Sequence, residues 1–277
     1  MSEVHPDPSG KYVLVDPSGR YHKNTLARNG VSKGTRWENR SVAHDPYLFD
    51  VEKRQLVSIF AGFDRLLTHV CFSPDGRWML LSDQSEPARI YNLKDGQLAH
   101  QLEGVKAGFS ASFSQDSKRL FMHQFNVGVW EVESGRQLVD LRDFDSALLG
   151  AWLNEDEGEI ITVTRRGILG FWNLDSGEMK NSLAMMNQED MSHKEYRWSR
   201  MSPDRRLLVI VTHHHLGQIE LWDTKTHEMI ASFRAHSHQV NEMAFSPDNQ
   251  WLATASDDFT VKAWPVGLFV QPLNVSR

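Results

Sequence analysis

The chain has 277 residues, of which 40% are hydrophobic and 24% are charged, and its formal net charge is −6. This balance suits a soluble globular protein and gives no general attraction for nucleic acid or an anionic membrane. A single cysteine, Cys71, excludes an internal disulfide. The first residues lack a signal peptide's basic and apolar regions, and no apolar run reaches the roughly 18 residues that cross a bilayer. We therefore expect a cytoplasmic protein.

Along the chain, an aromatic residue followed by a polar residue or proline closes a short apolar run six times. The pairs are Phe49-Asp50, Tyr91-Asn92, Trp130-Glu131, Trp172-Asn173, Trp222-Asp223 and Trp264-Pro265. In the first unit, strands are predicted at Lys11–Val15 and Tyr47–Val51. Each later unit starts with an alternating strand that ends in a turn such as Ser73-Pro74-Asp75, and a further apolar strand follows.

Each unit therefore holds four short strands, and no stretch shows convincing helical periodicity. A four-stranded unit cannot bury its faces alone, so successive units must stack on one another. The sequence predicts an all-β chain that forms a single β-propeller of four-stranded antiparallel blades. Six blades are favoured and seven are the alternative, with the N-terminal and C-terminal segments expected to pair in one sheet. The predicted blades are 1–62, 63–104, 105–143, 144–190, 191–234 and 235–277.

The last unit resembles a WD repeat. In that family a loop histidine, a hydroxyl residue on the second strand, an aspartate in the next turn and a tryptophan on the third strand often form a buried hydrogen-bonded set. These positions hold His236, Thr254, Asp258 and Trp264 here. The resemblance implies that the aspartate accepts from the imidazole, whose other nitrogen contacts the hydroxyl, and that the hydroxyl contacts the indole N–H. Such a set fixes a blade and is not a catalytic triad.

The other units depart from this pattern. The loop histidine is missing from the second, third and fourth units, and the aspartate position holds Ser85, Asn126 and Arg166. The fifth unit has Ile210 where the hydroxyl is expected. These blades are therefore expected to depend on apolar packing.

The resemblance also implies that one rim of the ring carries the turns between second and third strands and the loops between blades. Its cationic residues and histidines are Arg65, Lys106, Arg165, Arg166, Lys194, Arg197, His193, His213, His214, His215, His236 and His238. Acidic residues gather on the opposite rim. We expect the first rim to bind a protein partner through an acidic or phosphorylated segment. A mere scatter of solvated surface charges is the alternative.

The residues predicted to contact that partner are Arg165, Arg166, Arg197, His213, His214 and Asp257. Arg165 and Arg166 lead this set because they occupy a turn where the family has an acidic residue.

A histidine run, His213–His215, raises the question of a metal. Neighbouring residues of a strand point to opposite faces, so at most two of the three histidines share a site. Zinc needs three or four convergent ligands, and no known metal spacing is present. We therefore predict no metal and no cofactor.

Catalytic motifs are absent: the sequence has no nucleophile elbow, no phosphate-binding glycine loop and no cofactor fingerprint. Cys71 lies in a strand alternation typical of a core position. The sequence favours a non-catalytic protein–protein interaction module or scaffold. The alternatives are a propeller enzyme or metal-binding protein with a site near the central channel at His213–His215, and a nucleic-acid binder that uses the basic rim.

Overall fold

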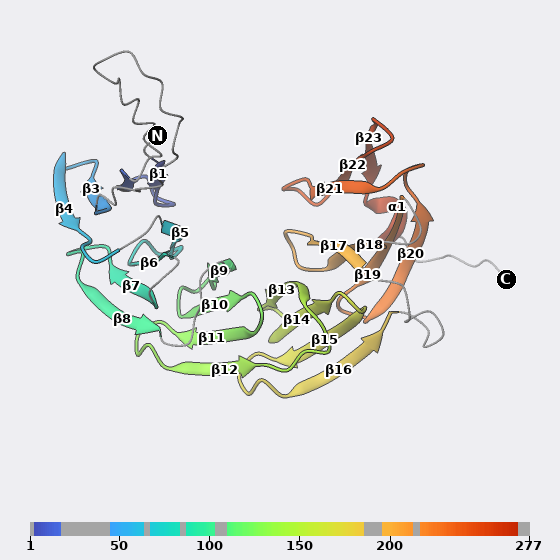
Figure 1. Ribbon diagram of the computed structural model, residues 1–277, viewed down its shortest axis with the longest axis horizontal. Coiled ribbons are helices and arrows are strands. Elements are labelled where there is room, and N and C mark those ends of the chain that lie inside the picture. The colour runs from blue at the N-terminus through green and yellow to red at the C-terminus, as the bar shows by residue number, and fades with distance from the viewer. Residues whose placement is uncertain are drawn as a thin grey trace, which may run out of the picture. The chain divides into compact units, whose positions relative to one another are not determined.

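A computed structural model describes residues 3–17, 45–63, 67–83, 87–102, 110–185, 196–212 and 217–270. Within these ranges the chain forms 23 β-strands and one short helix, α1 (Gly267–Val270). The strands form six antiparallel sheets, five with four strands and one with three (Figure 1). The predicted all-β fold of four-stranded antiparallel units is thus confirmed. In the described part of the chain, no helix has the length and apolar character needed to span a membrane.

The first three sheets follow chain order. The first consists of β1 (Glu3–Pro6), β2 (Tyr12–Asp16), β3 (Tyr47–Asp50) and β4 (Gln55–Ile59). The second consists of β5 (Leu67–Phe72), β6 (Trp78–Asp83), β7 (Ala88–Asn92) and β8 (Leu98–Leu102). The third consists of β9 (Ser110–Phe113), β10 (Arg119–His123), β11 (Val127–Glu131) and β12 (Gln137–Leu141).

The last three sheets continue in the same order. The fourth consists of β13 (Leu148–Asn154), β14 (Glu159–Thr164), β15 (Ile168–Asn173) and β16 (Met179–Ala184). The fifth consists of β17 (Tyr196–Met201), β18 (Leu207–Thr212), β19 (Gln218–Asp223) and β20 (Glu228–Arg234). The sixth consists of β21 (Val240–Phe245), β22 (Trp251–Ser256) and β23 (Val261–Pro265).

All six recurring aromatic residues lie on the third strand of their sheet, as the spacing predicts. The prediction that N-terminal and C-terminal segments pair in one sheet is wrong for the described residues. Strand β1 pairs with β2 in register Val4 to Val15, and the last sheet contains only β21, β22 and β23. The N-terminal segment meets its backbone hydrogen bonds locally, because β2 follows β1 after a tight turn.

The chain comprises two compact units, residues 1–122 with 130–137 and residues 123–129 with 138–277. The first two sheets lie in the first unit, and the last three lie in the second. The single propeller domain stays a prediction.

Neighbouring sheets within a unit pack through alternate residues of their second strands, since successive strand side chains point to opposite faces. In the second unit, Leu208 of β18 packs in a cluster with Ile161 of β14. The next residue, Val209, packs with Leu252 of β22. Strand β18 is thereby buried on both faces, which explains its continuous apolar sequence.

A serine and an aspartate close the first hairpin turn in four of the sheets. The serine hydroxyl donates to the aspartate two residues later, at 2.6 Å in Ser73–Asp75 and 2.6 Å in Ser202–Asp204. The same hydroxyl accepts the N–H of the residue that begins the second strand, at 2.9 Å for Trp78. These acidic residues therefore hold turns, which limits what the predicted acidic rim offers to a partner.

Candidate functional site

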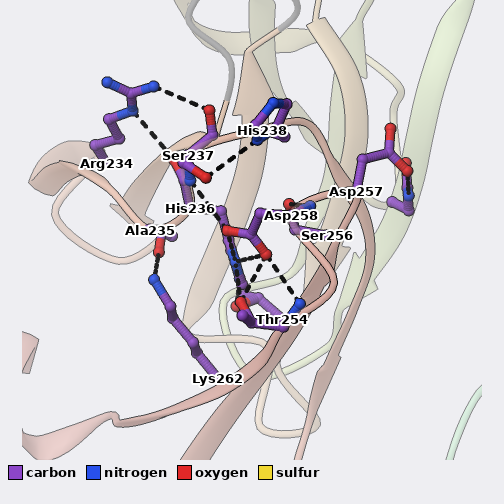
Figure 2. Close-up of polar contacts among 12 residues, drawn as sticks. Arg234, Ala235, His236, Ser237, His238, Thr254, Ser256, Asp257, Asp258 and Lys262 are labelled. Atoms are coloured by element: carbon purple, nitrogen blue, oxygen red, sulfur yellow. Dashed lines mark hydrogen bonds and ion pairs between the residues drawn. The ribbon is translucent and has the colours of Figure 1, made fainter.

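The predicted polar set lies at the sixth sheet, where His236, Thr254 and Asp258 meet (Figure 2). Trp264 joins them through the Thr254 hydroxyl. His236 follows β20, Thr254 lies on β22, Asp258 lies in the β22–β23 turn and Trp264 lies on β23. The Nδ1 atom of His236 is 3.0 Å from Oδ2 of Asp258, and Nε2 is 2.7 Å from the Thr254 hydroxyl. The indole N–H of Trp264 donates to that hydroxyl at 3.0 Å.

These distances fix the direction of each hydrogen bond. The carboxylate of Asp258 only accepts, so Nδ1 of His236 carries the proton and Nε2 accepts from Thr254. Thr254 in turn accepts from Trp264. Hydrogen bonds from the Thr260 hydroxyl (2.6 Å), the Ser237 N–H (3.0 Å) and His236 hold the pKa of Asp258 well below its usual range, although desolvation raises it.

The loop that carries His236 is fastened from both sides. The Arg234 guanidinium donates to the carbonyls of His236 at 3.1 Å and Ser237 at 3.0 Å (Figure 2). The Gly217 carbonyl accepts the N–H groups of Ala235 and His236 at 2.7 and 3.1 Å. These contacts of Arg234 and Gly217 were not predicted from the sequence, because both involve backbone carbonyl groups.

This set lacks the parts of a nucleophilic site. The Thr254 side chain is buried, and its hydroxyl is shared between the imidazole and the indole. His236 is 2% exposed, so its ring cannot reach a substrate. We interpret the set as structural: it fixes the inter-sheet loop and the β22–β23 turn.

The arginine pair Arg165–Arg166 lies in the tight turn between β14 and β15, and both residues are exposed. The Arg165 N–H donates to the Ala147 carbonyl at 2.8 Å, and the Arg166 N–H donates to the Ser146 hydroxyl at 3.1 Å. The turn closes with a left-handed glycine, Gly167, at φ 83°. Two cationic side chains are therefore presented from a firmly held backbone.

The other predicted contact residues have different positions. Asp257 is exposed in the β22–β23 turn and accepts a hydrogen bond from the Asn241 amide. The backbone of Arg197 belongs to β17, while its side chain lies outside the described part. His213, His214 and His215 lie outside the described residues. His236, which the sequence places on the basic rim, is buried and adds nothing to the surface charge.

Metal and thiol chemistry find no support in the described residues. Among them no group of three or more His, Cys, Asp or Glu residues is placed to hold a metal ion. Burial raises the pKa of the Cys71 thiol to about 12, so the thiolate is scarce at neutral pH.

The sixth sheet has the sequence of a known repeat. Residues 227–265 match the protein family described as "WD domain, G-beta repeat". This stretch contains His236, Thr254, Asp258 and Trp264, the residues whose hydrogen bonds define the site. Residues 227–265 therefore form a WD repeat, and the chain is similar to proteins of the WD-repeat family.

The chain is similar to curated proteins, one of which is a WD-repeat protein by name. The chain is 27% identical over 125 residues to WD repeat-containing protein 36 of Homo sapiens, a match that covers 42% of this chain and 13% of that protein. It is 31% identical over 218 residues to eukaryotic translation initiation factor 3 subunit I of Sclerotinia sclerotiorum, covering 74% of this chain and 63% of that protein. The chain thus spans less than two thirds of the length of these relatives.

One solved structure has a similar fold. The crystal structure of the computationally designed Ika8 protein matches this chain with a TM-score of 0.61 at 16% identity. The match covers 92% of this chain and 68% of the designed one. At this identity the likeness concerns the fold alone.

The fourth sheet keeps the hydroxyl and tryptophan of the polar set without its histidine and aspartate. The indole N–H of Trp172 donates to the Thr162 hydroxyl at 2.9 Å. Gly170 makes room for this bond, because a Cβ atom there would lie 2.8 Å from both bonded atoms. The expectation that this blade depends on apolar packing is therefore incomplete.

In the fifth sheet a carboxylate, and not a hydroxyl group, accepts the hydrogen bond of the tryptophan indole. Ile210 of β18 pairs with Glu220 of β19, whose carboxylate accepts from the Trp222 indole at 3.3 Å and the Tyr196 hydroxyl at 3.2 Å. Burial and the nearby carboxylate raise the pKa of Tyr196. Sequence reasoning missed this set. The only sequence signal for it was the acidic residue Glu220 two positions before Trp222. Residues two positions apart on a strand have side chains on the same face.

Proposed function

We propose that this protein is a non-catalytic interaction module that binds a partner protein through the turns between second and third strands. Its relative in Sclerotinia sclerotiorum is by name a subunit of a larger factor. The polar sets of the fourth, fifth and sixth repeats hold tryptophans in place and leave no nucleophile exposed. Protein binding is therefore the function these residues support best.

The observation that carries the proposal is the Arg165–Arg166 turn. An arginine at the surface costs side-chain entropy to fix, and two in one turn repel each other. The backbone N–H groups of Arg165 and Arg166 hold this turn through the Ala147 carbonyl and the Ser146 hydroxyl. Guanidinium groups match carboxylates and phosphates through paired hydrogen bonds, so we propose an acidic or phosphorylated segment as the bound element. A cytoplasmic location would suit the single cysteine and is part of the proposal.

The test is affinity capture from a lysate of the source organism with three purified baits. These are the wild type, Arg165→Glu/Arg166→Glu, and the control Lys94→Glu/Arg136→Glu, which makes the same charge change at exposed positions in other turns. Circular dichroism and melting curves establish that each bait is folded.

We expect a protein that the wild type and the control retain and the Arg165/Arg166 variant loses. If the Arg165/Arg166 variant retains every protein that the wild type retains, the proposed contact through these arginines is wrong.

A further inference from the structure

Phe259, in the β22–β23 turn, combines a fully exposed side chain with a left-handed backbone conformation. Its side chain is 100% exposed, and its backbone has φ 64°. A left-handed conformation is rare for a bulky side chain, and an exposed phenyl ring loses the benefit of burial. Folding of this chain therefore gains nothing from the ring.

The equivalent turns of the two preceding sheets contain glycine. Gly167 between β14 and β15 has φ 83°, and Gly217 between β18 and β19 has φ 77°. Glycine adopts this conformation without a steric penalty. A phenylalanine at the corresponding point of the sixth sheet calls for an explanation other than stability.

The turn around Phe259 is firmly fixed by its neighbours. The Phe259 N–H donates to the Ser256 carbonyl at 3.1 Å, and the Ser256 N–H donates to the Thr260 carbonyl at 3.2 Å. Thr260 also donates its N–H to Asp258 at 3.0 Å, which ties the turn to His236. The polar set therefore holds the backbone that carries the ring, so binding does not have to order this turn.

The surroundings of the ring indicate the chemistry of its occupant. Val261 is 76% exposed and extends the apolar character of the turn. Asp257 is exposed, and its side chain points away from the Asp258 set (Figure 2). An apolar group beside a carboxylate is complementary to an apolar pocket that is bordered by a cationic side chain.

We propose that Phe259 is an anchor which a partner protein buries in an apolar pocket, with a lysine or arginine of the partner beside Asp257. Large aromatic side chains at the centre of an interface often dominate its binding energy. The inference rests on the proposed interaction function and names a second contact, of opposite charge to the Arg165–Arg166 turn. It also assigns a purpose to the polar set, which holds the anchor as well as the sheet.

The decisive variant is Phe259→Gly, since glycine suits the backbone and removes the ring. We expect its melting temperature to equal or exceed that of the wild type. The control is Phe125→Ala, which removes a ring that is 72% exposed in the β10–β11 turn. If Phe259→Gly weakens binding without lowering stability, Phe259 is a binding residue and not a structural one.

The contact is located by placing the photo-crosslinker p-benzoyl-phenylalanine at position 259 in cells of the source organism. The crosslinked protein is then purified, and its affinity is measured for the wild type, Phe259→Gly, Asp257→Lys, Phe125→Ala and Arg165→Glu/Arg166→Glu. We expect Phe259→Gly to weaken binding about tenfold or more, as hot-spot truncations do. Asp257→Lys should weaken binding more at low salt than at high salt, and Phe125→Ala should leave it unchanged.

Three results would overturn the anchor: no adduct at position 259, wild-type affinity of Phe259→Gly, or an equal loss from Phe125→Ala. Loss of binding from the Arg165/Arg166 variant alone would leave the proposed function standing and remove Phe259 from it. Loss from Phe259→Gly alone would support the Phe259 contact and remove the Arg165–Arg166 turn from the interface.

Discussion

Thr254 connects two larger side chains through one hydroxyl group. It donates to His236 at 2.7 Å and accepts from Trp264 at 3.0 Å. The four residues of this set were predictable from the sequence because they stand at the characteristic positions of one WD repeat. Glu220 was not predictable as a partner of Trp222 and Tyr196, since that role depends on strand register and on which residue fills the hydroxyl position.

Replacing Thr254 by valine tests this connection. Valine keeps the shape but leaves the buried imidazole of His236 and the indole N–H of Trp264 without their partner, so we expect a loss of about 1–3 kcal/mol in the free energy of unfolding. Urea denaturation measures this loss. Thr254→Ser retains the hydroxyl and should lose less. Equal stability of the valine variant and the wild type would contradict the role given to Thr254.

The acid sensitivity of the fold should depend partly on Asp258. Its pKa in the folded chain lies below the ordinary unfolded value of about 3.9, so ionised Asp258 stabilises the fold above that pH. This contribution is lost as the pH falls through 4 and below. In Asp258→Asn, the stability lost between about pH 6 and about pH 3, measured by urea midpoints, should be smaller than in the wild type. The variant will still lose some stability at low pH, because the pKa values of three other aspartates, Asp7, Asp116 and Asp248, are also lowered.

At the scale of elements, the β18–β19 turn supports the loop after β20. Gly217 lies under that loop with φ 77°, and a Cβ atom there would lie 1.9 Å from the His236 carbonyl oxygen. The sequence indicated a turn at this glycine but could not reveal the close approach, which arises only when two sheets pack. The two strands predicted in the first unit agree with β2 and β3 to within one residue, because alternation is local.

Gly217→Ala is therefore expected to lower stability much more than an ordinary glycine substitution. The matched control is Gly158→Ala, whose backbone has φ 62° and whose added Cβ would meet nothing within 4 Å. The control should lose about 1 kcal/mol from backbone strain alone. The extra loss in Gly217→Ala, read from thermal or urea unfolding, measures the clash. Equal losses of stability in the two variants would contradict the clash, because the loop after β20 would then move aside without destabilising the fold.

At the scale of the whole molecule, the strands of the repeated sheets pack in the same way, whereas the exposed turns between them differ in sequence. Second strands such as β18 are buried on both faces, and the recurring aromatics all occupy third strands. The turns between second and third strands differ: one carries Arg165 and Arg166, and another carries Asp257 and Phe259. The fold was predictable because packing imposes the repeat. The partner was not, because exposed turn residues are free of that constraint.

The most direct test of the interaction account is the salt dependence of binding to the captured partner. Calorimetric titrations at about 50 mM and about 300 mM salt would compare the wild type, Arg165→Glu/Arg166→Glu and the Lys94→Glu/Arg136→Glu control. We predict that wild type and control bind alike and weaken with salt, and that the Arg165/Arg166 variant binds at least about tenfold more weakly at low salt. Equal affinity of all three proteins at both salt concentrations would contradict the account.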